Sequence, residues 1–360
     1  MSLLERLKTE IAAGGPIGVD VYMARCLHDP KDGYYATRPA LGEDGDFITA
    51  PMVSQMFGEL IGLWAVETWR RMGAPARVLL VEMGPGDGTL MSDVLRAARL
   101  APDFLDAAEL WLVETSRPLA ARQRERLAGA APAPRWIERL DEAPGDAPML
   151  LIANELLDCL PARQFVRTAE GLAERVVGLG QDGALAFGLR PAPLGAAPAA
   201  EGAACGALIE VSTAQQALAA ELGSRVVRQG GAALLIDYGS GEPGGGDTLQ
   251  ALARHTAVDP LAAPGEADLT VHADFPAVCG AAAAAGASVG LLTQGVFLGR
   301  LGIVERAAAL ARGRPDQAPR IERQLDRLIG DEAMGALFKA ACIHHPGLAP
   351  PAFEDASWSP

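Results

Sequence analysis

The stretch Val81-Glu82-Met83-Gly84-Pro85-Gly86-Asp87-Gly88-Thr89 decides the fold of this chain of 360 residues. It ends a run of aliphatic residues, Arg77–Glu82, of the kind found in parallel strands buried on both faces, and it precedes a helical pattern over Thr89–Leu100. Glycines let the backbone turn tightly and approach a ligand, and the free amides at the start of a helix favour an electronegative group. The stretch therefore predicts a strand-turn-helix unit that binds a nucleotide-like cofactor.

The spacing of the glycines separates the candidate cofactors. A dinucleotide-binding turn has the pattern G-x-G-x-x-G, whereas Gly84, Gly86 and Gly88 are each two positions apart and Thr89 occupies the place of the last glycine. The acidic residue Glu82 ends the strand, where it would crowd a pyrophosphate. These features disfavour a dinucleotide oxidoreductase, and a P-loop is excluded because its pattern G-x-x-x-x-G-K-[ST] does not occur.

Strands and helices alternate along the rest of the core. Each predicted strand is an apolar run followed by a polar or glycine-containing turn. The runs are Arg77–Glu82, Glu109–Val113, Met149–Ala153, Ala232–Ile236, Ser288–Leu292 and a closing strand over Leu337–Ile343. Helical patterns over Thr89–Leu100 and Pro118–Leu127 follow the first two strands. This order predicts an α/β fold with a Rossmann-like, doubly wound parallel sheet.

The order breaks between Pro161 and Gly206, where short alternating segments separated by glycine turns predict inserted antiparallel hairpins. Helical spacing over Leu3–Ala12 and Gln55–Met72 predicts a helical cap before the sheet. We therefore expect three parts: a cap with a covering loop at residues 1–75, a core at 76–345 with the hairpin insertion at about 161–206, and a tail at 346–360.

The charge of the chain limits its partners. Lys and Arg number 31 against 45 Asp and Glu, which gives a net charge of −14, and no stretch is strongly basic. Duplex DNA and anionic membrane surfaces attract a positive protein surface, so we expect this chain to bind neither. Membrane insertion is not expected either, because no run of about eighteen apolar residues appears. A cationic segment of a partner protein suits this surface better. The oligomeric state is left open.

The five cysteines form no Cys-x-x-Cys pair, so neither a disulfide framework nor a zinc site is expected. Cys342 with His344 and His345 is discounted as a metal site, because neighbours on a strand point to opposite faces. The first ten residues mix both charges, and no run of about eighteen apolar residues appears. We expect a cytoplasmic protein, or one of the mitochondrial matrix if a presequence is absent from this chain.

Two acidic residues and the three glycines of the turn together favour one cofactor. Glu-x-Gly-x-Gly-x-Gly, from Glu82 through Gly84 and Gly86 to Gly88, is typical of class I methyltransferases that use S-adenosylmethionine. Glu114 ends the second strand, where a carboxylate can accept both ribose hydroxyls of a nucleotide. Taken singly, the turn could be a structural β-α turn and Glu114 a solvated strand end. Together they favour a cofactor site.

Several longer segments resemble the MidA family of methyltransferases, whose mitochondrial members are protein arginine methyltransferases that assist assembly of respiratory complex I. They are GDFITAPMVSQMFGE at 45–59, GPGDGTL at 84–90, ANELLDCLP at 153–161, IDYG at 236–239, DTLQA at 247–251, ADLTVHADF at 267–275 and TQG at 293–295. The resemblance covers residues 15 to 345. Two departures stand out: Met83 and Asp87 occupy positions where we expect Leu and Arg, and Val296 replaces an acid.

Asn154, Glu155 and Asp158 follow the third strand at the carboxyl edge of the predicted sheet, where open α/β sheets bind their ligands. A guanidinium stays protonated near neutral pH, so an enzyme that methylates it must hold it with carboxylates and localise electron density on one nitrogen. We expect Glu155 and Asp158 to be catalytic and Asn154 to contact the cofactor. The alternative is an asparagine helix cap with acids in the first turn.

Further residues are expected around the acceptor. Two lie at the end of the strand after the insertion, three lie in the loop before the sheet, and a histidine lies in a polar segment: Asp237, Tyr238, Asp46, Thr49, Gln55 and His272. Tyr34 and Tyr35 would add an aromatic wall.

Three functions are compatible with these features of the sequence. The first is an S-adenosylmethionine-dependent protein arginine N-methyltransferase. The second is a methyltransferase that acts on another acceptor, because the sequence identifies the cofactor site better than the acceptor site. The third is an assembly factor that keeps the pocket without turnover.

Overall fold

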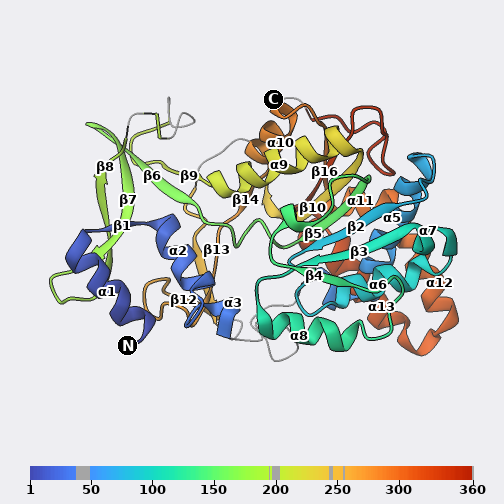
Figure 1. Ribbon diagram of the computed structural model, residues 1–360. Helices are drawn as coiled ribbons and strands as arrows, with labels where there is room; N and C mark the ends of the chain where they lie inside the picture. Colours follow the sequence, from blue (N-terminus) through green and yellow to red (C-terminus); the bar gives the residue numbers. More distant parts are fainter. Residues whose placement is uncertain (38–48, 194, 197–202, 243–245, 254–255, 359–360) are drawn as a thin grey trace.

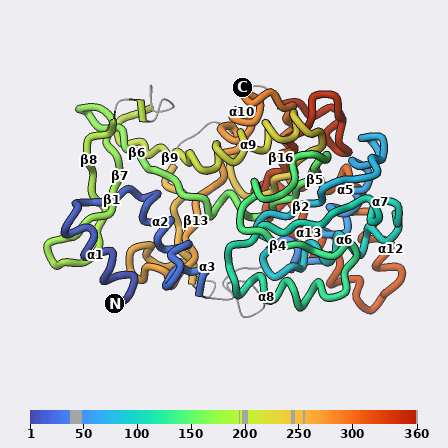
Figure 2. The backbone as a smooth tube through the Cα atoms, in the orientation of Figure 1, coloured from blue at the N-terminus to red at the C-terminus, as the bar shows by residue number. Residues whose placement is uncertain are grey.

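A computed structural model describes residues 1–37, 49–193, 195–196, 203–242, 246–253 and 256–358. Two lobes lie side by side (Figure 1). The larger lobe is built on a wide sheet flanked by helices, and the smaller one contains the amino terminus and a separate antiparallel sheet. The carboxyl terminus lies on the larger lobe (Figure 2).

The sheet of the larger lobe has the strand order β15-β16-β10-β5-β2-β3-β4, and β14 pairs with β10. The strands are β2 (Val78–Met83), β3 (Ala108–Val113), β4 (Arg135–Ile137), β5 (Met149–Asn154), β10 (Gly231–Ser240), β14 (Ala273–Asp274), β15 (Ser288–Thr293) and β16 (Phe338–His344). The five from β4 to β10 are parallel, while β16 runs antiparallel to both of its neighbours.

The α/β prediction is confirmed, but the expectation of a wholly parallel sheet is wrong. The apolar runs locate the strands to within a few residues, including β16. A run of buried aliphatic residues does not encode strand direction, which depends on how the preceding helices return the chain to the sheet. The short strand β4 was not predicted, because Arg135 and Trp136 do not form an apolar run.

Helices cover both faces of this sheet, and side chains alternate along each strand. Leu80, Leu150 and Leu234 face a cluster that includes α5 (Gln55–Arg71) and α6 (Thr89–Ala98). Leu79 and Leu235 face the opposite cluster, which includes α9 (Thr213–Gln229) and α10 (Phe275–Ala284). The helices of the larger lobe also include α4 (Ala50–Val53), α7 (Pro102–Ala107), α8 (Arg117–Arg126), α9 (Thr213–Gln229), α10 (Phe275–Ala284), α11 (Gln294–Arg300), α12 (Ile303–Gly313), α13 (Ala318–Ile329) and α14 (Met334–Leu337).

The smaller lobe contains the predicted antiparallel hairpins. Its sheet joins β1 (Ile17–Gly18), β6 (Arg163–Thr168), β7 (Gly171–Leu179), β8 (Leu185–Pro191) and β9 (Leu208–Val211), and every pairing is antiparallel. Helices α1 (Leu3–Gly14), α2 (Val19–His28) and α3 (Tyr34–Thr37) belong to this lobe, as do β11 (Gln250–Ala253), β12 (Thr256–Val258) and β13 (Asp268–Thr270). The last three strands were not predicted.

Residues 1–75 contribute to two packing clusters. Leu3, Leu7 and Tyr22 pack beside Val177 of β7, whereas α5 packs against α6 in the larger lobe. Residues 346–360 also contribute to packing, since Phe353 is buried in the cluster of α5 and α6. Among the described residues, no helix combines the length and apolar character that a bilayer crossing requires.

Candidate active site

A cavity of about 280 Å³ opens at the carboxyl ends of β2, β3 and β5. Residues of the glycine turn and the Asn154–Asp158 turn line it, and Thr49, Pro51 and Met52 border it from the segment that contains α4. His28 and Tyr35 of the smaller lobe form another part of its wall. The cavity therefore lies where the two lobes meet.

The glycine turn has the conformation that its sequence predicts. Gly84, Gly86 and Gly88 have φ values of +64°, +57° and +84°, a region that side chains with a Cβ rarely adopt. Gly84 and Gly86 line the cavity, whereas Gly88 is the N-cap of α6 and lies outside the lining. The Asp87 carboxylate accepts a hydrogen bond from the amide of Thr89, the first residue of α6, at 2.9 Å.

Glu114 lies beside this turn, directly after β3. Its carboxylate accepts hydrogen bonds from the Ser116 amide at 2.6 Å and from Gln123 Nε2 at 2.9 Å, and burial raises its pKa. The same Gln123 nitrogen donates to the Gly86 carbonyl at 2.8 Å, so it links Glu114 to the glycine turn. Sequence reasoning missed Gln123, because a buried glutamine in a charged helix gives no pattern.

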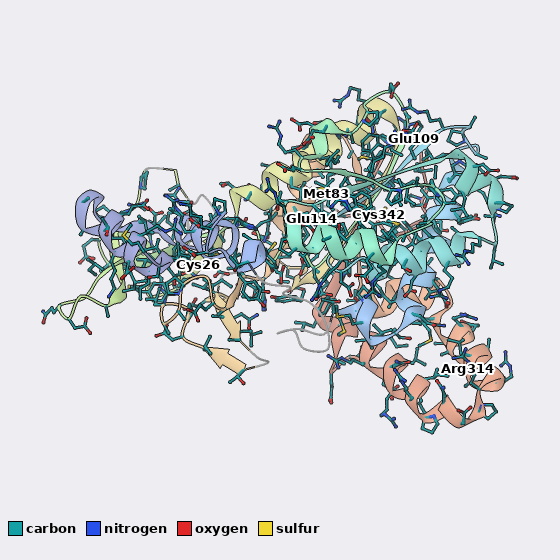
Figure 3. All side chains as sticks on the ribbon, turned by 60° about the horizontal axis from the view of Figure 1, so that its bottom comes forward. Cys26, Met83, Glu109, Glu114, Arg314 and Cys342 are labelled. Carbon is teal, nitrogen blue, oxygen red and sulfur yellow. The ribbon has the colours of Figure 1, made fainter. Side chains whose placement is uncertain are left out.

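We expect Glu114→Gln to raise the dissociation constant of S-adenosylhomocysteine roughly 10- to 100-fold, because charge-assisted hydrogen bonds contribute about 1.5–3 kcal/mol. Calorimetric titration measures this change. Glu109→Gln is the matched control, since Glu109 lies toward the other end of the same strand, paired with Arg77 and Arg135 (Figure 3). Equal affinity in the Glu114 variant and the wild type would remove Glu114 from the cofactor site.

Two buried acceptors at the ends of neighbouring strands are unpaired. Glu82, at the end of β2, is 2% exposed, and neither its Oε2 nor Asn154 Oδ1 has a hydrogen-bond partner among the described residues. Burial, with a smaller effect from Asp87 and Glu114, raises the pKa of Glu82 to about 8. Buried polar atoms without partners are rare in folded proteins. These two are suited to a ligand that carries hydrogen-bond donors.

The Asn154–Asp158 turn supplies the other carboxylates of the cavity. Glu155 has a φ of +52°, a conformation that costs a residue with a side chain about 1–3 kcal/mol and that recurs at functional sites. Its Oε1 accepts hydrogen bonds from the Ala50 amide at 3.1 Å and from Asn154 Nδ2 at 2.9 Å. No helix begins at Asn154 in the described structure, so the helix-cap alternative does not explain these acids.

The acids of this turn are strongly desolvated. Burial raises the pKa of Glu155 to about 7 and that of Asp158 to about 6, and Asp158 adds to the shift of Glu155. Burial and the charges of Asp158 and Glu155 also raise the pKa of Asp237 well above its ordinary value. Of the three, Glu155 and Asp158 line the cavity, and this pair is suited to a cationic ligand, which would compensate their charge.

The residues expected at the acceptor occupy different places. Thr49 and Tyr238 line the cavity, and the Tyr238 side chain lies beside Asp158 and lowers the pKa of that carboxyl group. Gln55 lies on α5, where its Nε2 is 3.4 Å from Glu59 Oε1. His272 packs edge-on against Tyr238, with ring centres 5.3 Å apart. Gln55 and His272 do not line the cavity.

Two other expected residues are not at the cavity surface. Asp237 is completely buried beneath the Asn154–Asp158 turn and does not line the cavity. Asp46 lies outside the described residues. No group of three or more histidine, cysteine or acidic residues in the described segments is arranged to hold a metal ion.

The smaller lobe contributes a wall that sequence reasoning largely missed. His28 stacks on Tyr35 with ring centres 5.8 Å apart, and the Tyr35 hydroxyl donates to the Asp268 carboxylate at 3.0 Å. All three line the cavity. Only Tyr35 was expected, because nothing in the sequence relates α2 and β13 to the glycine turn.

Known proteins are similar to this chain over most of its length. Residues 60–293 match the family described as "Putative S-adenosyl-L-methionine-dependent methyltransferase". The chain is 33% identical to the zebrafish (Danio rerio) mitochondrial protein arginine methyltransferase NDUFAF7, over 94% of this chain and 86% of that one. It is 34% identical to the human protein of that name, over 93% and 82% of the two chains.

A solved structure is also similar over nearly the whole chain. It is a Burkholderia thailandensis protein crystallised with S-adenosyl-homocysteine, with a TM-score of 0.87 and 32% identity, covering 99% of this chain and 95% of that one.

These comparisons correct one expectation. The cytoplasmic location expected from the sequence is wrong, because the relatives named above are mitochondrial proteins. The mixed charge of the first ten residues argues only against a targeting segment at that position, and it carries no information about the compartment in which the relatives act.

Proposed function

Because the chain belongs to the MidA-type family of S-adenosylmethionine-dependent methyltransferases, as the match over residues 60–293 and relatives at 33–34% identity show, we propose that it methylates an arginine of a partner protein. The family expected from the motifs is confirmed, and the cofactor is S-adenosylmethionine. The acceptor is the proposal.

The residues of the cavity divide between the two ligands. We place the cofactor against Gly84, Gly86 and Glu114, with donors of its amino-acid portion at Glu82 and Asn154. When bound, it supplies a methyl group that its sulfonium already activates. Gly88 would act indirectly, by setting the start of α6.

The single observation that carries the arginine proposal is the pair of carboxyl groups of half-buried Glu155 and buried Asp158, in the same cavity as the glycine turn. A guanidinium keeps its proton near neutral pH and is held best by fork-shaped, charge-assisted hydrogen bonds from carboxylates. These bonds fix its plane and localise electron density on the nitrogen that attacks the methyl carbon. One proton must leave that nitrogen, and a carboxylate with a pKa near 7, as for Glu155, is suited to accept it.

Other features support a protein acceptor. The net charge of −14 favours a cationic segment, and the relatives are named protein arginine methyltransferases. We include respiratory complex I assembly in the proposal, as the motif resemblance implies. Helices on both faces of the mixed sheet support a doubly wound, class I arrangement, and the position of α4 over the cavity supports a covering role for the segment before the sheet.

The direct test incubates the protein with methyl-tritiated S-adenosylmethionine and a pool of synthetic peptides that carry a central arginine. Acid hydrolysis and amino-acid analysis then identify the methylated residue. Methylarginine supports the proposal. Label on another residue would favour the second function, and tight S-adenosylhomocysteine binding without transfer to any acceptor would favour an assembly factor.

The carboxyl groups give this activity a specific pH dependence. Their raised pKa values, about 7 for Glu155 and about 6 for Asp158, keep them protonated until the pH passes these values. The charge of Asp158 raises the pKa of Glu155, and Arg327 from α13 lowers it. We therefore expect kcat/KM for the peptide to be high above pH 7 and to fall as the pH drops through 7 to 6, with apparent pKa values that belong to the pair.

Initial rates between pH 5 and pH 9 measure this dependence. Titration of S-adenosylhomocysteine over the same range separates the effect of Glu82, whose pKa is about 8, from that of the acceptor side. A rate that stays constant down to pH 5 would contradict the assignment, because carboxyl groups with ordinary pKa values near 4 behave in that way.

A further inference from the structure

The turn that carries Glu155 and Asp158 has no regular secondary structure, so its backbone groups need other partners. Asp237, a completely buried residue of β10, lies below the turn and accepts hydrogen bonds from two of its backbone amides. Its Oδ2 accepts hydrogen bonds from the Leu157 amide at 2.8 Å and the Asp158 amide at 3.2 Å. Its Oδ1 accepts from the Tyr238 amide at 2.8 Å, so both oxygens are used.

The carbonyl groups of the same turn are held from two other elements. Gln215, 1% exposed on α9, donates from Nε2 to the Leu157 carbonyl at 2.8 Å, and its Oε1 accepts from the Asp274 amide at 3.0 Å. The Val271 amide donates to the Asp158 carbonyl at 2.9 Å. At the start of the turn, the Glu155 amide donates to the Ile236 carbonyl at 2.8 Å.

We propose that Asp237 and Gln215 are positioning residues that hold the Glu155–Asp158 turn in the geometry required for methyl transfer. The inference rests on the proposed function of Glu155 and Asp158. It also assigns Asp237 a different role from the substrate contact expected from its sequence position, since both oxygens of its carboxylate accept backbone amides and it does not line the cavity.

The strained backbone of Glu155 explains why such anchors matter. A residue in the left-handed region returns to a more favourable conformation unless surrounding contacts prevent it. In Asp237→Asn, the side-chain N–H₂ group would face either the Leu157 and Asp158 amides or the Tyr238 amide. Because two donors cannot hydrogen-bond to each other, at least one of these contacts would be lost. A shift of about 1 Å in a catalytic group lowers turnover by about 100-fold.

The test compares Asp237→Asn and Gln215→Leu with Asp29→Asn. Asp29 serves as the control because it is buried outside the cavity lining and its carboxylate accepts the Lys31 and Asp32 amides of a turn in the smaller lobe. Unlike Asp237, it also pairs with Arg6. For the first two variants we expect kcat to fall about 10- to 100-fold, while the dissociation constant of S-adenosylhomocysteine changes less than about threefold. Asp29→Asn should lower the apparent kcat only by the fraction of the variant that is unfolded at the assay temperature. Gln215→Leu keeps the test valid if Asp237→Asn does not fold.

Hydrogen exchange of the peptide that contains residues 154–160 gives a readout that does not depend on an acceptor. The Leu157 and Asp158 amides should exchange at least about tenfold faster in Asp237→Asn than in the wild type or in Asp29→Asn. Unchanged exchange, turnover within twofold of the wild type, or equal losses of turnover and cofactor affinity would each overturn the inference. If the wild type methylates no arginine but the exchange differs as expected, the proposed function fails and the anchoring stands.

Discussion

Glu155→Gln is expected to bind S-adenosylhomocysteine as tightly as the wild type and to lower kcat for an arginine peptide by about 10²–10³-fold. Glutamine keeps an oxygen that can accept hydrogen bonds from the Ala50 amide and from Asn154, so the turn should stay folded. It removes the negative charge that would hold the guanidinium and the group that would take its proton. Stopped-time assays with labelled cofactor and calorimetry on the same preparation measure the two quantities.

Glu210→Gln is the control for this variant. Glu210 lies on β9, hydrogen-bonded to Gln164 and Thr248, and burial raises its pKa too, but it does not line the cavity. The control should keep most of the activity. If Glu155→Gln retains kcat within a few-fold of the wild type, Glu155 does not take part in the reaction and the acceptor side must be assigned to other carboxyl groups.

Gly86→Val is expected to abolish cofactor binding, with an affinity at least about 100-fold below that of the wild type. Gly86 has a φ of +57°, which a β-branched residue adopts only with strain, and its side chain would occupy space that the glycine turn leaves for the ligand. The Gly86 carbonyl also accepts the hydrogen bond from Gln123, so a change of backbone conformation would disturb Glu114. Calorimetric titration with S-adenosylhomocysteine measures the loss.

Gly129→Val separates the conformational strain from the loss of binding space. Gly129 has a φ of +74° and no atom within 4 Å of the position that a Cβ would take. This variant should lose stability and keep its affinity for the cofactor. Tight binding by Gly86→Val would show that the cofactor does not lie against the glycine turn.

The residues that we propose for the cofactor could be brought together from the sequence because they are local. Glu82, Gly84 and Gly86 lie close together in one strand-turn-helix unit, and Glu114 follows the neighbouring strand, so strand order alone brings them together. The Asn154–Asp158 turn was found for the same reason, since β5 pairs with β2. The position of each strand in the sequence was thus sufficient to place these residues.

The rest of the site depends on contacts that no local pattern encodes. Gln123 reaches the glycine turn through the packing of α8, and the depth of Asp237 follows from the register of β10 against β5. His28 and Asp268 reach the cavity because the smaller lobe folds against the sheet. Strand direction was missed at β16 for a similar reason, since it is a property of the chain path and not of the strand itself.

The wall that the smaller lobe contributes has a consequence for how this protein can be divided. His28, Tyr35 and Asp268 come from segments far apart in the sequence, and they face residues from β2, β3 and β5 across one cavity. The site is therefore not a module that can be transplanted or excised. A fragment limited to the larger lobe would lack this wall, and a fragment limited to the smaller lobe would lack every glycine of the turn, so neither fragment would contain the whole cavity.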